Sequence, residues 1–356
     1  MKKTGIRLVA ATAGVSIGTV SKVLNPNPAI NAMVSAETTA KVLAAVKKVD
    51  YRPSYCATLM HGQSTRTLGF VPLMPSDRDG VYMSGYAARI LNGVGQVATA
   101  HGYQVLIIHS DEFRSFMDIR RVDAIAFVGF KLANNPEGRA MKAMFRHFNE
   151  RGYAYAVING NAGDVPVPRV EVDNAAAMAL AAKLILRKGY PTVGFVGELA
   201  ENPLEHHCER LKALRAALSG TAAKLLPKAV FNGPSNGLAA QPRDEGYSYR
   251  DGATALGKMA EAGTLPRCLV CGNDHIAIGV LSAARERGIR VPEDLAVIGF
   301  DDDVHTAFLS PSLTTLRQPL EDFGVRAAEY LMARIAKRDA TLDLRVAPQL
   351  IERGSA

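Results

Sequence analysis

The sequence predicts an α/β protein in which a small three-helix unit precedes a two-lobed body of doubly wound parallel sheets. Three observations support this prediction. The excess positive charge is confined to the first 66 residues, apolar residues in that segment recur at helical spacing, and short apolar runs alternate with amphipathic stretches thereafter. The chain has 356 residues, which suits two or three domains of ordinary size.

The N-terminal segment carries nearly all of the net charge. Its 66 residues contain nine lysines and arginines and only two acidic residues, whereas the whole chain has a net charge of +8. A basic run is often no more than a solvated tail. Because this one also has the apolar pattern of a folded unit, it indicates a nucleic-acid-binding module.

Three short helices are predicted in this headpiece. Gly14 is suited to end the first helix, Ser16 to cap the second and Ser35 to cap the third, which stops before Pro53. The apolar stripes are Ile6, Val9, Ala10 and Ala13; Val20, Val23 and Leu24; and Val42, Leu43, Val46 and Val49. The pattern is helix, glycine-containing turn, helix, helix.

These residues closely resemble the headpiece of the lac-repressor (LacI/GalR) family of transcriptional regulators. The resemblance rests on Val9-Ala10, Ala13-Gly14-Val15-Ser16, Thr19-Val20-Ser21-Lys22-Val23-Leu24-Asn25, Val34-Ser35, Thr38, Val42 and Tyr51-Arg52-Pro53. It implies that the helix from Ile17 to Asn25 enters the major groove of double-stranded operator DNA. The implied DNA contacts are Ser16, Ile17, Gly18, Thr19, Ser21, Lys22, Asn25, Tyr51, Arg52, Ser54, Ala57 and Leu59.

Side-chain chemistry limits what the base-reading positions can do. Lys22 can donate to guanine, whereas Ile17 can offer only apolar contact, for instance to a thymine methyl group. The alternative interpretation of Ile17 is an exposed helix residue without a base contact. Gly18 has no side chain and cannot recognise a base by itself. The chain departs from the family pattern at Gly5 and Leu8, which remove the first capping box, and in a longer loop over residues 26–33.

Residues 53–66 are expected to form a hinge helix and linker after the headpiece of residues 1–52. A helix of about eight residues is unstable alone in water, so we expect it to be ordered mainly on DNA. The resemblance implies that Leu59 from each of two subunits wedges into the minor groove. The alternative is that Leu59 packs on its own headpiece.

The body is expected to contain two lobes with a ligand between them. Its apolar runs are residues 68–73, 105–108, 124–128, 154–158, 193–196, 268–270 and 295–300, separated by helix-length segments that end at Gly102, Gly152, Gly189 and Gly288. We assign residues 67–172 and 318–342 to the first lobe and residues 173–317 and 343–356 to the second. By resemblance, the body is similar to periplasmic binding proteins.

Polar residues follow several of these strands, where ligands of such sheets bind. Asn159, Asn273 and Asp301 occupy strand ends, and the resemblance adds Arg210 and Gln318 as contacts of a sugar-like effector. The alternative interpretation of each of these residues is a capping or turn residue. The chain has no tryptophan to stack on a sugar ring, so the candidates are Phe300, Tyr82, Tyr86, Phe113 and Tyr249, with Phe300 included in the expected site.

Other motifs do not support catalysis or metal binding. Cys268 and Cys271 spell C-x-x-C, but residues three apart in a strand point to opposite faces. Residues 14–18 read G-x-S-x-G without a preceding strand, and residues 252–258 read G-x-x-x-x-G-K inside a helical pattern. We therefore expect no enzyme, no catalytic residues, no metal and no cofactor. Without a signal peptide or a membrane span, we expect a cytoplasmic protein.

The best interpretation is a sequence-specific DNA-binding regulator, a repressor, controlled by a small effector in the cleft between the lobes. The expected partners are double-stranded operator DNA, a sugar, sugar phosphate or sugar acid, and a second copy of the chain, with no membrane. The alternative is a sugar-binding transport-type receptor with the same body fold, for which the basic headpiece has no purpose.

Overall fold

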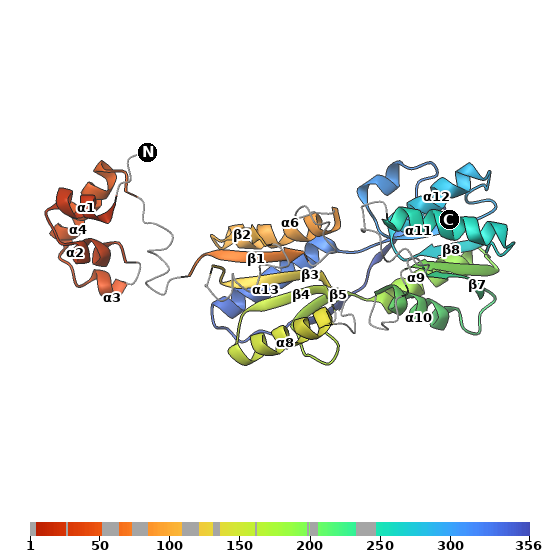
Figure 1. Ribbon diagram of the computed structural model, residues 1–356, viewed down its shortest axis with the longest axis horizontal. Coiled ribbons are helices and arrows are strands. Elements are labelled where there is room, and N and C mark those ends of the chain that lie inside the picture. The colour runs from red at the N-terminus through yellow and green to blue at the C-terminus, as the bar shows by residue number, and fades with distance from the viewer. Residues whose placement is uncertain are drawn as a thin grey trace. The chain divides into compact units, whose positions relative to one another are not determined.

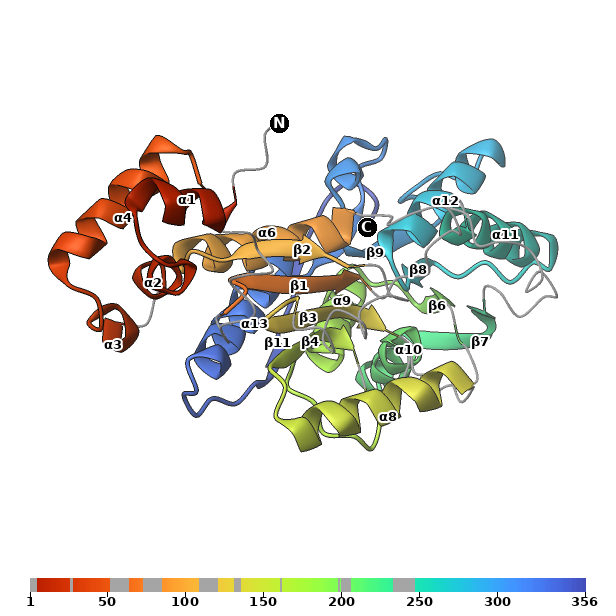
Figure 2. The same cartoon turned by 60° about the vertical axis from the view of Figure 1, so that its left-hand side comes forward.

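The computed structural model of the chain describes residues 5–25, 28–51, 64–72, 85–108, 121–130, 136–160, 162–197, 199, 206–232 and 247–356. The chain divides into two compact units, Met1–Thr65 and Arg66–Ala356. Figure 1 and Figure 2 show the helices and strands of each unit.

The first unit contains the helices expected of the headpiece. They are α1 (Ile6–Ala13), α2 (Ile17–Val23), α3 (Pro28–Asn31) and α4 (Ala36–Lys48). Gly14 ends α1 with a φ of 66°, and Ser16 and Ser35 cap α2 and α4 by accepting the backbone N–H groups of Thr19 and Thr38. Gly5 provides no side-chain cap for α1, as the missing capping box predicts.

A small core joins α1, α2 and α4. Val9, Val20 and Val42 are fully buried at its centre. Leu43 was expected on the buried face of the third helix, but its side chain is 46% exposed, so that assignment is wrong. Its neighbour Val42 already occupies the core, and adjacent residues of a helix point about 100° apart. The expected loop also contains the single helical turn α3.

The first lobe of the body is a six-stranded sheet with the order β11-β5-β4-β3-β1-β2. The strands are β1 (Thr67–Pro72), β2 (Gln104–Ile107), β3 (Ala124–Phe130), β4 (Tyr155–Gly160), β5 (Arg169–Val172) and β11 (Asp343–Val346). Helices α6 (Gly85–Ala100) and α13 (Leu320–Ile335) pack together on one face, and α8 (Pro136–Arg151) covers the other (Figure 1).

The second lobe is another six-stranded sheet, with the order β12-β10-β9-β8-β6-β7. Its strands are β6 (Thr192–Gly197), β7 (Lys224–Asn232), β8 (Cys268–Cys271), β9 (Ala296–Asp301), β10 (Thr314–Arg317) and β12 (Gln349–Ile351). Helices α9 (Asn174–Arg187) and α10 (His206–Leu218) lie on one face, and α11 (Tyr247–Glu261) and α12 (Asp274–Glu286) on the other (Figure 2). A 3₁₀ helix, η1 (Val304–Phe308), follows β9.

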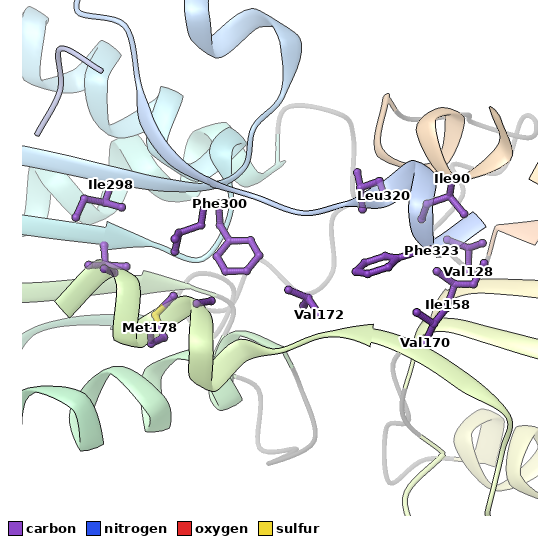
Figure 3. Packing of buried hydrophobic residues seen from close by; sticks show 14 of the residues in the cluster. Ile90, Val128, Ile158, Val170, Val172, Met178, Ile298, Phe300, Leu320 and Phe323 are labelled. Carbon is purple, nitrogen blue, oxygen red and sulfur yellow. The ribbon is translucent and has the colours of Figure 1, made fainter. Parts of the chain in front are cut away.

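The chain passes between the two sheets after β5, between β10 and α13, and between β11 and β12. The expected boundary between residues 342 and 343 is wrong, because β11 pairs in parallel with β5 of the first lobe. The charged, alternating sequence of β11 suits an edge strand and gives no strong apolar run. One buried cluster continues through both lobes, and Figure 3 shows Val172 between the groups around Phe300 and Phe323.

Local predictions in the body are largely confirmed. Each apolar run forms a strand, and Gly102, Gly152, Gly189 and Gly288 all have positive φ. Cys268 and Cys271 belong to the clusters on opposite faces of the second sheet. The G-x-x-x-x-G-K segment lies inside α11.

Candidate functional sites

Helix α2 presents a mixed apolar and basic face on the surface of the headpiece. Ile17, Gly18 and Lys22 are exposed, whereas Val20 and Val23 of the same helix are buried in the core. The Ile17 side chain is 44% exposed at the start of a polar helix face. An aliphatic side chain in this position is suited to contact with an apolar group of a partner. The Ser16 cap orders this first turn.

A hydrogen bond connects α3 to the residues that follow the end of α2. Asn31 of α3 donates from Nδ2 to the main-chain oxygen of Asn25 at 3.0 Å. Tyr51 packs against the headpiece core and is only partly exposed. Four further residues of the expected DNA contact set, Arg52, Ser54, Ala57 and Leu59, lie outside the described residues.

In the body, a chain of hydrogen bonds joins the two lobes at the carboxyl ends of their strands. Gln318 donates from Nε2 to Asp301 Oδ1 at 2.6 Å and accepts at Oε1 from Asn159 Nδ2 at 2.9 Å. Asn159 also donates to the Tyr86 hydroxyl and accepts from the Val172 backbone N–H. The structure therefore brings three expected site residues together, with the Asn159 amide engaged by protein groups on both sides.

Arg210 is held in place by three contacts in the second lobe. Its guanidinium donates from Nε to Asn174 Oδ1 at 2.9 Å and from Nη1 to the Gly272 main-chain oxygen at 2.5 Å. It lies over the Phe300 ring, 3.5 Å from the ring centroid. Phe300 is fully buried, so in this arrangement it supports Arg210 instead of facing open space.

Asn273 is the N-cap of α12. Its Oδ1 accepts the backbone N–H of Ile276 at 2.8 Å, as the alternative reading predicts. Among the described residues, its Nδ2 group has no hydrogen-bond partner. Of the candidate aromatic residues, Tyr249 stacks on His275 with centroids 4.7 Å apart, and Tyr82 and Phe113 lie outside the described residues.

The backbone is strained where the strand-end residues project. Asn159, Asp301 and Asp302 have φ values of 47°, 116° and 56°, a region that non-glycine residues rarely adopt. Such strain is maintained only where surrounding contacts over-determine the geometry, and it concentrates at functional sites. These three residues thus mark the polar chain between the lobes as a constrained site.

Burial controls the electrostatics around Asp301. Loss of solvent raises the pKa of the Asp301 carboxyl, and this effect exceeds the opposing attraction of Arg210 and the hydrogen bond from Gln318. The pKa of Asp274 is raised further by burial and by the charge of Asp301. The Asp274 carboxyl accepts the Thr315 hydroxyl at 2.6 Å and the Asp303 N–H at 2.7 Å. Gly299 leaves room for it, since a Cβ there would lie 2.2 Å from Asp274 Oδ1.

A pH titration of stability tests the burial of Asp274. Because the pKa of Asp274 is raised in the folded state, the folded chain holds a proton that the unfolded chain releases above about pH 4. The free energy of unfolding therefore falls as the pH rises from about 4 toward the pKa of Asp274 in the folded chain. We expect Asp274→Asn to make this decline shallower between about pH 4 and pH 7, measured by denaturant unfolding. Asp339→Asn, an exposed carboxylate, is the control and should leave the slope unchanged. Parallel slopes for the Asp274 variant and the parent would contradict the prediction.

Two contacts of the site had no clear sequence signal. Asn174 braces Arg210 and also donates to Glu209 Oε2, yet in sequence it reads only as the first residue of a helix. His206 places Nε2 3.0 Å from the Asn159 main-chain oxygen, across the lobes. Only the fold brings these residues to the site.

Two negative observations bear on the expected function. No group of three or more His, Cys, Asp or Glu side chains in the described part of the chain could hold a metal ion. Within the same residues, no single helix is long and apolar enough to span a membrane, and α1 with α2 meets the length and composition only as a pair bent by 99°.

Comparison with known proteins gives consistent matches to both units. Residues 6–54 match the bacterial regulatory proteins of the lacI family, and residues 182–356 match the periplasmic binding protein-like domain. The HTH-type transcriptional regulator in the aml 5′ region of Streptomyces limosus is 30% identical over 98% of this chain and 93% of its own. Catabolite control protein A of Priestia megaterium is 26% identical, covering 97% and 96%.

Among solved structures, the lac repressor dimer bound to operator and the anti-inducer ONPF superposes with a TM-score of 0.75. The alignment covers 99% of each chain at 20% sequence identity, a likeness that shows the fold. Each unit of the present chain therefore has a counterpart in proteins of one architecture.

Proposed function

Because the chain belongs to the lacI family of bacterial regulatory proteins, we propose that it is a cytoplasmic, non-enzymatic repressor that reads an operator through α2 and responds to a sugar-like effector. It is a DNA-binding transcriptional regulator with an α/β effector domain. The observation that carries the proposal is the exposed face of α2, with Ile17 and Lys22 on a helix fixed by its cap and core.

The headpiece supports a reading mode with few direct base contacts. Lys22 is the one exposed cation of the described α2, and its ammonium can donate to guanine O6 and N7. Ile17 adds apolar contact, and Gly18 allows a close backbone approach because it has no side chain. Thr19 and Ser21 supply hydroxyls suited to phosphate contacts, which fix the register without reading sequence.

The base-reading role of Lys22 is testable with operator duplexes selected from a random pool. Lys22→Ala should weaken binding to the best duplex about 5- to 150-fold and remove the preference at one base pair, because one base contact is lost. Lys41→Ala is the matched control: this lysine is exposed on α4 and pairs with Glu37 at 2.8 Å. It should change affinity less and leave the preference intact. Equal effects of the two substitutions would contradict base reading by Lys22.

The effector would bind at the polar chain between the lobes. Asp301 can accept from ligand hydroxyls, and Arg210 and Asn273 can donate to hydroxyl or carboxylate oxygens. These groups are held by Gln318, Phe300 and the α12 cap, so they are organised before the ligand arrives. This set of donors and acceptors fits a sugar, a sugar phosphate or a sugar acid.

A thermal-shift screen of these three compound classes tests the effector proposal, because a bound ligand raises apparent stability by mass action. Hits should disappear in Asp301→Ala. Hits that persist unchanged in that variant would place the effector elsewhere. A pseudo-palindromic operator has approximate two-fold symmetry, which a symmetric dimer matches. The active form would therefore be a homodimer on such a site.

A further inference from the structure

The turn Asp301–Asp303, which begins at the last residue of β9, carries three consecutive carboxylates, and the second lobe fixes it firmly. The Asp302 carboxylate accepts hydrogen bonds from Arg317 Nε at 2.6 Å and from Arg353 Nη2 at 2.7 Å. Since Asp302 is buried and both guanidiniums are charged, these are strong hydrogen bonds. The turn therefore moves with the second lobe as one piece.

The first lobe touches this turn through the beginning of α6. Arg89 Nη1 donates to the main-chain oxygen of Asp302 at 3.3 Å, between residues 213 positions apart. A Cβ at Gly85 would lie 3.6 Å from Asp303 Oδ2, so that carboxylate also lies against the first residue of the helix. The positive end of a helix dipole favours such an anion. Within the described residues, Arg89 forms no ion pair, and this carbonyl is its anchor.

The contact differs from the hydrogen bonds that Gln318 makes between the lobes. Gln318 bridges Asn159 and Asp301, but it lies on a segment that crosses from β10 to α13 and is therefore part of the connection itself. Arg89 lies on a helix of the first lobe, far in sequence from every crossing. Its bond to Asp302 can exist only when the lobes adopt a particular relative arrangement.

We propose that Arg89 is a positioning residue that couples the effector site to the angle between the lobes. Its carbonyl partner belongs to the residue next to Asp301, so a ligand that moves the second lobe through Asp301 also moves the peptide that Arg89 holds. An effector changes a conformational equilibrium only through contacts that differ between the two states, and this bond is such a contact. The coupling rests on the proposed function, since it takes Asp301 as the effector-binding carboxylate.

The test needs no effector. Arg89→Gln removes the charge and shortens the reach, Arg89→Lys keeps a charged donor, and Gln96→Ala, on the exposed face of the same helix, is the matched control. Two quantities are measured on the full chain: the dissociation constant for its selected operator, and the hydrogen-exchange rate of the Val172 N–H, which bonds to Asn159 at a crossing between the lobes.

Arg89→Gln should change the operator dissociation constant at least about threefold and speed exchange at Val172 at least about threefold, because the lobe arrangement loses one restraint. Arg89→Lys should lie between this variant and the parent, and Gln96→Ala should match the parent. Unchanged exchange and affinity in a folded Arg89→Gln chain, checked by its melting temperature, would overturn the coupling. If the parent fails to bind any duplex, the proposed function fails, while the exchange measurement still decides whether Arg89 restrains the lobes.

Discussion

Replacing Arg210 by alanine is expected to weaken binding of the best compound from the thermal-shift screen by about 100-fold or more. The substitution removes a buried cation that lies over Phe300 and attracts Asp301. It also leaves Asn174 Oδ1 and the Gly272 carbonyl without their donor. Truncating a buried charged group that contacts a ligand costs about 3 kcal/mol of binding free energy, which corresponds to about two powers of ten in affinity.

Arg215→Ala is the control for this prediction, because Arg215 is exposed in the last turn of the same helix, α10. It should leave ligand affinity unchanged. Arg210→Lys should recover little, since an ammonium cannot satisfy both acceptors and stack on the ring. Isothermal titration measures all three variants. Affinity within about threefold of the parent for Arg210→Ala would remove Arg210 from the effector site.

Replacing Gly93 by alanine is expected to destabilise the first lobe by about 3 kcal/mol, which lowers the melting temperature of a body of this size by about 5 °C. A Cβ at Gly93 would lie 2.0 Å from the Glu321 main-chain oxygen, and one at Gly324 would lie 2.1 Å from the Ile90 oxygen. Helices α6 and α13 approach backbone to backbone at these two glycines. The clash is with main chain, so no side-chain rotation relieves it.

Gly95→Ala is a matched control two residues away on the same helix. A Cβ there meets nothing within 4 Å, so alanine should only reduce the freedom of the unfolded chain and improve helix propensity. We expect a gain of about 0.5–1 kcal/mol. Thermal unfolding followed by circular dichroism distinguishes the opposite signs. Similar shifts in melting temperature for both substitutions would show that α6 and α13 do not approach backbone to backbone at Gly93.

Much of the fold could be predicted from local sequence. The headpiece was predictable because caps and terminators such as Ser16, Ser35 and Gly14 act within a few residues of themselves. The buried parallel strands were predictable because both of their faces are apolar. Strands such as β7 and β11 were not, since their half-exposed, charged sequences carry no run and are ordered by pairing with distant segments.

The candidate site was only partly predictable, for a related reason. Asn159, Asp301 and Gln318 stand at strand ends or crossings, which a sequence pattern can identify, and the structure joins them by hydrogen bonds. The packing of distant segments decides that the Arg210 guanidinium lies over the Phe300 ring. It also decides that Arg89 reaches the turn beside Asp301. No local pattern encodes such contacts.

The central claim is that the basic headpiece is a duplex-DNA reader, and its most direct test is the salt dependence of binding by the full chain to a duplex of random sequence. Each neutralised phosphate contributes about −0.9 to the slope of log K against log salt. We expect a slope of about −4 or steeper, from at least about five phosphate contacts. Absence of measurable binding at low salt, or a slope near zero, would contradict the claim.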